Sequence, residues 1–251
     1  MPPRRRERVS RTVWLFDLDD TLHDASHAAF GHTSVAMNDY MVGHLGMAPA
    51  EATRLREHYW RRYGATLLGL VRHHGVEAKH FLTKTHLHPG LEERLRMSRH
   101  DRAALKRLRG RMYILTNAPR DYTMRVLNTL RLTGLFDGVI SIEDMSMFGQ
   151  LRPKPDARMF RHIAARLKVR PSDCVLVEDM LENQKAARGV GMRTAWMQRY
   201  LAGRYRGHLR GGARSGSNAA LRPREVGVHP CPSPRYVCAK IRSLQQLLTL
   251  R

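Results

Sequence analysis

A short apolar run that ends in closely spaced aspartates is the feature that most constrains how this chain folds. Residues 13–16 are apolar and predict a buried strand, and an Asp-x-Asp-x-Thr cluster follows at Asp17, Asp19 and Thr21. The same residue types are common in a turn that caps the next helix. Carboxylates are costly to bury unless a cation pairs with them, so we expect a cation at the end of this strand. Mg²⁺ is the cation that we expect there.

Three further segments place polar residues at the end of a predicted strand or before a predicted helix: Thr116 and Asn117 after residues 112–115, Lys154 between two prolines, and Glu178 and Asp179 after residues 174–177. Each of them alone is also typical of a helix cap, a turn or a solvated helix start. Their joint occurrence makes independent accidents improbable. Ligands of open parallel sheets bind outside the carboxyl ends of the strands. We therefore expect Asp17, Thr116 and Asp179 to converge.

Taken in this order, the four motifs resemble those of the haloacid dehalogenase-like (HAD-like) hydrolase superfamily, over about residues 11–197. Residues 14–23, 63–70 and 178–183 are similar to the pyrimidine 5′-nucleotidase branch of that superfamily. The resemblance implies a phosphatase built on an α/β fold. Four ordered motifs are far more specific than any one of them.

The pattern of apolar residues divides the chain into regions. Strand and helix signals alternate after residue 100, which predicts a Rossmann-like parallel sheet core with helices on both faces. Helical spacing without strand signals predicts an inserted all-helical cap domain at residues 24–97. The core domain then comprises residues 13–23 and 98–251, after a basic N-terminal arm at residues 1–12. Residues 199–235, rich in Gly, Arg, Pro and Ser, predict a flexible insertion in the core.

Individual elements follow from the same patterns. The strands expected in the core after the first are residues 112–115, 138–142, 174–177, 193–197 and 236–239. The helices expected there are residues 98–109, about 120–132, one that opens at Asp156, 181–188 and 243–248. In the cap, an apolar and aromatic stripe is expected to pack inside the domain: Tyr59, Trp60, Tyr63, Leu67, Leu68 and Leu70.

The resemblance also implies roles for the motif residues. Asp17 is expected to be the nucleophile, whose carboxylate attacks phosphorus and forms an aspartyl-phosphate. Asp19 is expected to donate a proton to the leaving oxygen and later to accept one from water. Dehalogenases of the superfamily typically lack this second acid, so Asp19 favours phosphoryl chemistry. Lys154 is expected to reach the phosphoryl oxygens and Asp17, while Thr116 and Asn117 form hydrogen bonds to the same phosphoryl group.

A carboxylate and a phosphate repel each other, and Mg²⁺ would neutralise that repulsion. The resemblance places Mg²⁺ on the side chain of Asp17, the main-chain oxygen of Asp19 and Asp179. Glu178 is expected to contact these ligands from outside, or to reach the metal through a water molecule, and Asn183 is expected to orient the ligands.

Composition bears on partners and location. The formal net charge is +22, and half of that surplus lies in residues 1–12 and 199–235. These arginine-rich segments leave nucleic-acid binding open, but we favour arginine-rich coding as their explanation, because no recognition fold accompanies them. Three cysteines are too few for a disulfide framework. The chain has neither an apolar run long enough for a membrane span nor the apolar core of a secretory signal, so a cytoplasmic location is expected.

These observations lead to one main hypothesis and several alternatives. The main hypothesis is a Mg²⁺-dependent phosphomonoester hydrolase that acts on pyrimidine nucleoside 5′-monophosphates. The alternatives on the same machinery are a phosphatase of sugar phosphates or phosphoglycolate, and a phosphomutase. A nucleic-acid-binding protein on a phosphatase fold is the alternative outside enzymes. The partner expected in the main hypothesis is a small-molecule phosphate ester, and the pattern predicts no oligomeric state.

Overall fold

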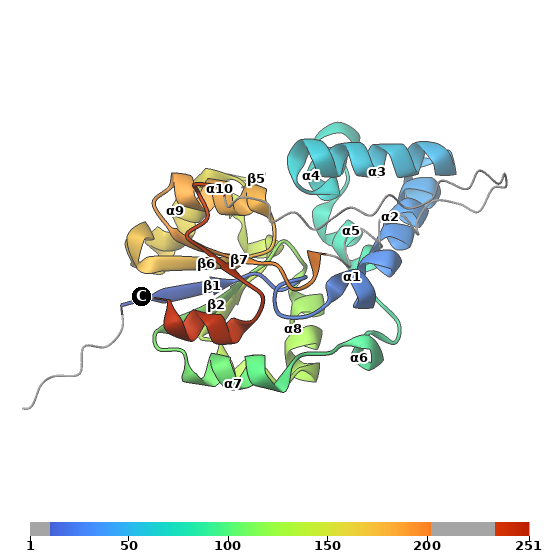
Figure 1. Cartoon of the computed structure of the whole chain (residues 1–251). Coiled ribbons are helices and arrows are strands. Elements are labelled where there is room, and N and C mark those ends of the chain that lie inside the picture. Colours follow the sequence, from blue (N-terminus) through green and yellow to red (C-terminus); the bar gives the residue numbers. More distant parts are fainter. Residues whose placement is uncertain (1–10, 202–233, 251) are drawn as a thin grey trace, which may run out of the picture.

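The computed structural model describes residues 11–201 and 234–250. A six-stranded sheet, in the order β3-β2-β1-β6-β7-β8, forms the centre of the core (Figure 1), and each pair of neighbouring strands is parallel. Its strands are β1 (Val13–Phe16), β2 (Arg111–Leu115), β3 (Gly138–Ile140), β6 (Cys174–Glu178), β7 (Arg193–Met197) and β8 (Ala239–Ile241). The predicted α/β fold with a parallel sheet is therefore confirmed.

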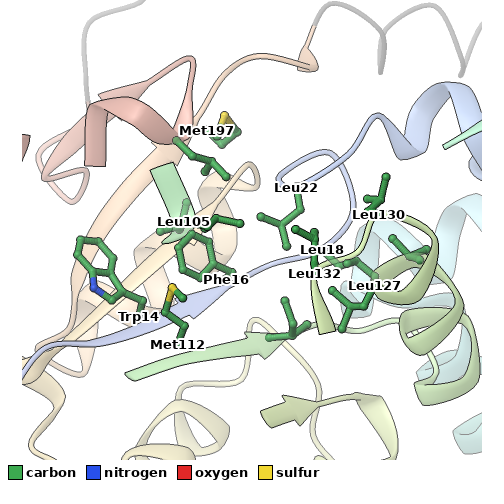
Figure 2. Close-up of a cluster of buried hydrophobic side chains, with 14 of the residues drawn as sticks. Trp14, Phe16, Leu18, Leu22, Leu105, Met112, Leu127, Leu130, Leu132 and Met197 are labelled. Atoms are coloured by element: carbon green, nitrogen blue, oxygen red, sulfur yellow. The ribbon is translucent and has the colours of Figure 1, made fainter. Parts of the chain in front are cut away.

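Strand β1 lies in the middle of the sheet and sends its side chains into two apolar layers. All four of its residues are buried, because β2 and β6 pair along its two edges and apolar clusters cover both faces. Trp14 and Phe16 belong to one apolar cluster, with Leu105 and Met197 among its members (Figure 2), whereas Leu15 packs into the cluster on the other face. Successive residues of a strand point to opposite faces, so one short run supplies both layers.

Helices cover both faces of the sheet (Figure 1), as predicted. They are α7 (Arg99–Arg107) and α8 (Arg120–Thr129), which pack on the layer of Trp14, and α9 (Ala157–Arg166) and α10 (Leu181–Gly189), which pack on the layer of Leu15. Ser98 caps α7 by accepting a hydrogen bond from the His100 N–H, and Asp156 caps α9 by accepting one from Arg158. Helix α7 ends two residues before the predicted Arg109, since Leu108 already has an extended backbone.

Short 3₁₀ helices and one hairpin complete the core. They are η1 (Thr133–Leu135), η2 (Ile142–Asp144), η3 (Pro171–Asp173) and the antiparallel pair β4 (Ser146–Met147) and β5 (Gln150–Leu151). The end of the chain differs from the prediction. The last strand begins at Ala239 rather than at Tyr236, whose carbonyl instead accepts a hydrogen bond from the Thr194 hydroxyl. The last helix is the 3₁₀ helix η4 (Leu244–Thr249) rather than an α-helix.

The region predicted as the cap consists of helices: α1 (Ala25–Ala28), α2 (Phe30–Leu45), α3 (Pro49–Tyr63), α4 (Thr66–His74), α5 (Ala78–Thr85) and α6 (Leu91–Arg94). Ala28 of α1 and Leu91 of α6 pack into a cluster of the core, whereas helices α2 to α5 share an apolar cluster of their own. Tyr59, Leu67 and Leu70 of the predicted stripe are buried in this cluster, and Tyr63 packs at its edge. The prediction for Trp60 was wrong, because its place on α3 leaves it 39% exposed. Leu68 is half-buried.

Two predictions lie wholly or largely outside the described residues: the basic arm at residues 1–12 and the insertion at residues 199–235. The domain limits of the core and the cap stay predictions. Ile142 of the core packs into the apolar cluster of the cap, so the two regions share part of their packing. None of the described helices has the length and apolar character that crossing a bilayer requires.

Candidate active site

Parallel pairing brings three sequence motifs to one edge of the sheet. Phe16, the last residue of β1, lies opposite Ile114 in β2 and Val177 in β6. The residues that follow these strands therefore emerge side by side. The Asp17 N–H donates to the Val177 carbonyl over 3.0 Å, which extends the strand pairing by one step and holds Asp17 at the edge.

Three carboxylates meet at this edge, one from β1 and two from β6. Asp17, Glu178 and Asp179 each offer an oxygen within 4.8 Å of the others, and all three residues are buried. In the described part of the chain, this is the group of acidic, histidine or cysteine side chains whose spacing would suit a metal ion. The carboxylates of Asp17 and Asp179, 162 positions apart in the numbering, thus lie close enough to share one ion.

Lys154 is the cation placed among these carboxylates. Its Nζ donates to Asp17 Oδ1 over 2.7 Å and to Glu178 Oε2 over 2.7 Å, and the residue is only 2% exposed. Burial by itself lowers the pKa of a lysine, but the two carboxylates outweigh it and raise the pKa of Lys154. The lysine is therefore held as an ammonium at the centre of the site.

One ammonium does not balance three carboxylates. Burial and the neighbouring Glu178 raise the pKa of Asp17 to about 7, even though Lys154 acts in the opposite direction. Burial acts to raise the pKa of Glu178 as well, but Lys154 and further hydrogen bonds lower it. The excess of negative charge fits a divalent cation, and carboxylate oxygens are the donors that Mg²⁺ prefers. The residues present thus fit the metal that the sequence leads us to expect.

Asp19 lies at the same edge, but its carboxylate is not part of that group. Its Oδ1 accepts a hydrogen bond from the Tyr122 hydroxyl over 2.8 Å and lies 3.1 Å from His23 Nε2. Burial acts to raise the pKa of Asp19, but the hydrogen bonds from His23 and Tyr122 lower it. A metal contact of Asp19 through its main-chain oxygen, as the resemblance implies, stays a prediction.

Thr116 and Asn117 follow β2 and differ in what their side chains do. Asn117 holds the main chain of Lys154 on both sides: its Nδ2 donates to the Lys154 carbonyl over 2.9 Å, and its Oδ1 accepts from the Lys154 N–H over 3.0 Å. Its amide therefore positions the main chain of the lysine, while the expected hydrogen bond from Asn117 to a phosphoryl group stays a prediction. The Thr116 hydroxyl accepts a hydrogen bond from the Ala118 N–H over 3.0 Å, which leaves its proton for donation to a ligand.

Asn183 is buried in the first turn of α10. Its side chain makes no hydrogen bond to the carboxylates within the described residues. The orienting role expected for it therefore has no support in the contacts of this structure.

Tyr122 and His23 are site residues that the sequence interpretation did not single out. His23 stands four positions after Asp19 in the loop that leaves β1, and this short spacing is a signal that could have suggested the contact. Tyr122 is 103 positions from Asp19 and belongs to the first turns of α8. No local pattern links Tyr122 to Asp19, because only the packing of α8 brings the hydroxyl to the carboxylate.

Comparisons with known proteins agree with this geometry. A family model described as haloacid dehalogenase-like hydrolase matches residues 12–191. Phosphate metabolism protein 8 of Saccharomyces cerevisiae is 24% identical over 195 residues, which are 73% of this chain and 60% of the yeast protein. A phosphoglycolate phosphatase of Nitrosospira multiformis is 30% identical over 107 residues, 43% of this chain and 42% of that protein. The chain thus spans about half the length of these curated relatives.

Solved structures share the fold. A HAD phosphatase of Thermococcus onnurineus superposes with a TM-score of 0.55 at 20% identity, covering 94% of this chain and 95% of that one. Identity at this level supports the fold alone. The family model, in contrast, spans well over half of the chain and includes all the motifs at the edge of the sheet. The chain therefore belongs to the haloacid dehalogenase-like hydrolases.

Proposed function

We propose that this protein is a Mg²⁺-dependent phosphatase that works through an aspartyl-phosphate, with pyrimidine nucleoside 5′-monophosphates as substrates. The observation that carries the proposal is the buried cluster of Asp17, Glu178 and Asp179 around the Lys154 ammonium. Such a site neutralises an approaching phosphate dianion only when a further cation joins it. Asp19, beside the cluster, supplies the second acid that phosphoryl transfer needs.

The first half of the reaction forms a covalent intermediate. One oxygen of the Asp17 carboxylate attacks phosphorus, and the bond from phosphorus to the ester oxygen breaks. Asp19 donates a proton to that leaving oxygen, which departs as an alcohol. Lys154 stays bound to Asp17 and Glu178 and donates to the phosphoryl oxygens, together with the Thr116 hydroxyl.

The second half restores the enzyme. Asp19, now a carboxylate, takes a proton from water as the water oxygen attacks phosphorus. The bond between phosphorus and Asp17 breaks, inorganic phosphate leaves, and both aspartates return to their starting state. When bound, Mg²⁺ supplies the positive charge that lets a carboxylate meet a phosphate, and the side chains of Asp17 and Asp179 with the main-chain oxygen of Asp19 would hold it. Glu178 accepts hydrogen bonds from Lys154 Nζ and from the Met180 N–H, and it therefore helps to position the lysine beside these ligands.

The contact between the cap and the lysine loop supports a role of the cap in substrate choice. Gly64 belongs to residues 63–70, one of the segments that resemble the pyrimidine 5′-nucleotidase branch. A Cβ at Gly64 would lie 2.8 Å from Pro155 Cδ and 3.3 Å from the Lys154 carbonyl. This segment therefore lies directly on the loop that presents the catalytic lysine, where it can contact the leaving group.

Phosphoglycolate is the second candidate substrate, because one relative is named a phosphoglycolate phosphatase. Sugar phosphates and phosphomutase chemistry use the same groups and stay alternatives. The cytoplasmic location also stays a prediction, and so does nucleic-acid binding through the arginine-rich segments, which we do not favour. Deletion of residues 199–235 would test the latter, because an RNA-binding protein would lose RNA affinity while hydrolysis persisted.

A substrate panel tests the proposal. Phosphate release with Mg²⁺ is compared for UMP, CMP, phosphoglycolate and glucose 6-phosphate, and for wild type against Asp17→Asn. We expect higher kcat/KM for the two nucleotides, and at least about a 1,000-fold loss of turnover in Asp17→Asn without loss of fold. Equal kcat/KM across the panel would remove the nucleotide assignment, and an active Asp17→Asn enzyme would remove the nucleophile.

A further inference from the structure

The carboxylate of Asp19 is held at only one of its two oxygens. The Tyr122 hydroxyl donates to Oδ1 over 2.8 Å, and His23 Nε2 lies 3.1 Å from the same atom. Within the described residues, Oδ2 forms no hydrogen bond, and the side chain of Asp19 keeps 18% of its surface exposed. The carboxylate thus has one oxygen anchored by hydrogen bonds and one without a hydrogen bond among the described residues.

The two anchoring side chains have few other polar contacts. His23 is fully buried, and its Nδ1 has no hydrogen-bond partner among the described residues. The ring therefore donates from Nε2, since a proton on Nδ1 would be buried without an acceptor. Tyr122 is 2% exposed, and its hydroxyl contacts Asp19 and, over 3.5 Å, His23. Burying a hydroxyl and an imidazole is costly, and the hydrogen bonds to Asp19 are what offset that cost here.

Tyr122 is also placed where the cap returns to the core. Its ring packs against the rings of His86 and His88, with centroid distances of 6.1 and 5.1 Å. Arg125, three residues further along α8, donates to the carbonyls of Leu87 and His88. The segment that leaves the cap is thus held on α8 beside Tyr122, and its two histidine rings pack against the phenol ring that donates to Asp19.

From this geometry we infer that Tyr122 and His23 are positioning residues: they fix Oδ1 of Asp19 so that Oδ2 exchanges the proton with the leaving oxygen and with water. The inference rests on the proposed function, because it concerns the acid of that same reaction. Within the described residues, the hydrogen bonds of the Tyr122 hydroxyl and of the His23 ring reach Asp19 and each other, not Lys154 or Asp17. Their effect is confined to steps in which Asp19 transfers a proton.

This inference is tested by how much each substitution lowers kcat/KM for substrates with different leaving groups. An alkyl phosphate such as UMP needs a proton on its leaving oxygen, whereas p-nitrophenyl phosphate releases a stable phenolate and does not. In Tyr122→Phe we expect kcat/KM for UMP to fall about 10- to 100-fold, and kcat/KM for p-nitrophenyl phosphate to change by less than about threefold. His23→Phe should show the same pattern with a smaller loss. Mg²⁺ affinity, measured by calorimetry, should equal that of the wild type in both variants.

Two further variants sharpen the result. Tyr40→Phe removes another phenol hydroxyl, one that is 2.9 Å from His80 Nδ1 inside the cap, and should leave the ratio of the two substrates unchanged. In an Asp19→Asn background, Tyr122→Phe should cause no additional loss, because its effect passes through Asp19.

The inference is overturned if Tyr122→Phe lowers kcat/KM equally for both substrates, leaves both unchanged, or adds its loss to that of Asp19→Asn. Failure of both Tyr122→Phe and His23→Phe to fold would also overturn it, since it would assign these side chains to structure alone. A wild-type enzyme that hydrolyses neither substrate, or an Asp17→Asn variant as active as wild type, would instead refute the proposed function.

Discussion

Polar side chains at the candidate active-site edge of the sheet and in the cap differ in their burial and in their partners. At the edge they are charged and buried, and several share one partner: Lys154 serves both Asp17 and Glu178. In the cap they pair as tyrosine and histidine near the surface, as Tyr63 does with His73 over 2.7 Å. Water can replace a partner that is lost in the cap, but it cannot reach a charge left unpaired at the edge. Contacts at the edge should therefore dominate both activity and stability.

The largest effect on stability should come from the central lysine. Lys154→Met removes the ammonium and leaves buried carboxylates next to one another, so we expect the free energy of unfolding to fall by about 3–5 kcal/mol in the absence of metal. Saturating Mg²⁺ should restore part of that loss, because a cation again faces the carboxylates. Urea unfolding with and without Mg²⁺ measures both quantities.

Lys185→Met is the matched control for this change, since Lys185 is exposed on α10. It should alter the free energy of unfolding by less than about 0.5 kcal/mol. If both variants lost the same free energy of unfolding, the charges at this edge would not be more important for stability than exposed ones. The proposed difference between the edge and the cap would then be refuted.

A smaller effect is expected where the cap meets the lysine loop. Gly64 has a φ of +78°, and an added Cβ would lie 2.8 Å from Pro155 Cδ. Gly64→Ala should therefore lower the free energy of unfolding by about 1–2 kcal/mol and also lower kcat, because either the cap or the lysine must shift. Gly75→Ala carries a similar backbone strain, at a φ of +64°, with no atom within 4 Å of the new Cβ. It should lower stability but leave kcat unchanged; an equal fall of kcat in Gly75→Ala would show that contact with the lysine loop is irrelevant.

The smallest effect concerns pH, at the segment that leaves the cap. Burial lowers the pKa of His86 and of His88 from 6.5 to about 4. At His88 the neighbouring His86 lowers the pKa further, as do His32 and Arg125, whereas the carboxylate of Asp19 acts in the opposite direction on both histidines. Between about pH 6.5 and pH 4 the unfolded chain binds protons that the folded chain does not. Stability should therefore fall as the pH falls through this window, and these groups should contribute no further change above it.

The double variant His86→Gln/His88→Asn isolates this contribution. Its loss of stability between pH 7 and pH 5, measured by urea unfolding, should be smaller than that of the wild type by about 1 kcal/mol, less than the full shift implies because His86 is partly exposed to solvent. An identical pH dependence in the two proteins would show that these rings do not stay neutral in the folded state.

Prediction from the sequence succeeded where the signal was local. Apolar runs located the strands of the core, and the helical patterns that open at Ser98 and Asp156 placed the starts of α7 and α9 correctly. Prediction from the sequence was less accurate where few apolar residues mark an element. The start of the last strand was predicted three residues too early. Tyr236 and Val237 have the residue types of a strand, but the pairing with β7 starts at Ala239.

The sequence by itself determined which residues stand at the ends of the central strands, because burial on both faces makes those strands apolar and makes a following Asp17 or Asp179 conspicuous. The family resemblance also implied the contact of Lys154 with Asp17. Only the tertiary structure decided the other partners: it gave Lys154 its second carboxylate, Glu178, turned Asn117 toward the lysine main chain and brought Tyr122 to Asp19. Hydrogen bonds between side chains 24 to 137 positions apart depend on how loops and helices pack, and hydrophobic periodicity carries no information about that packing.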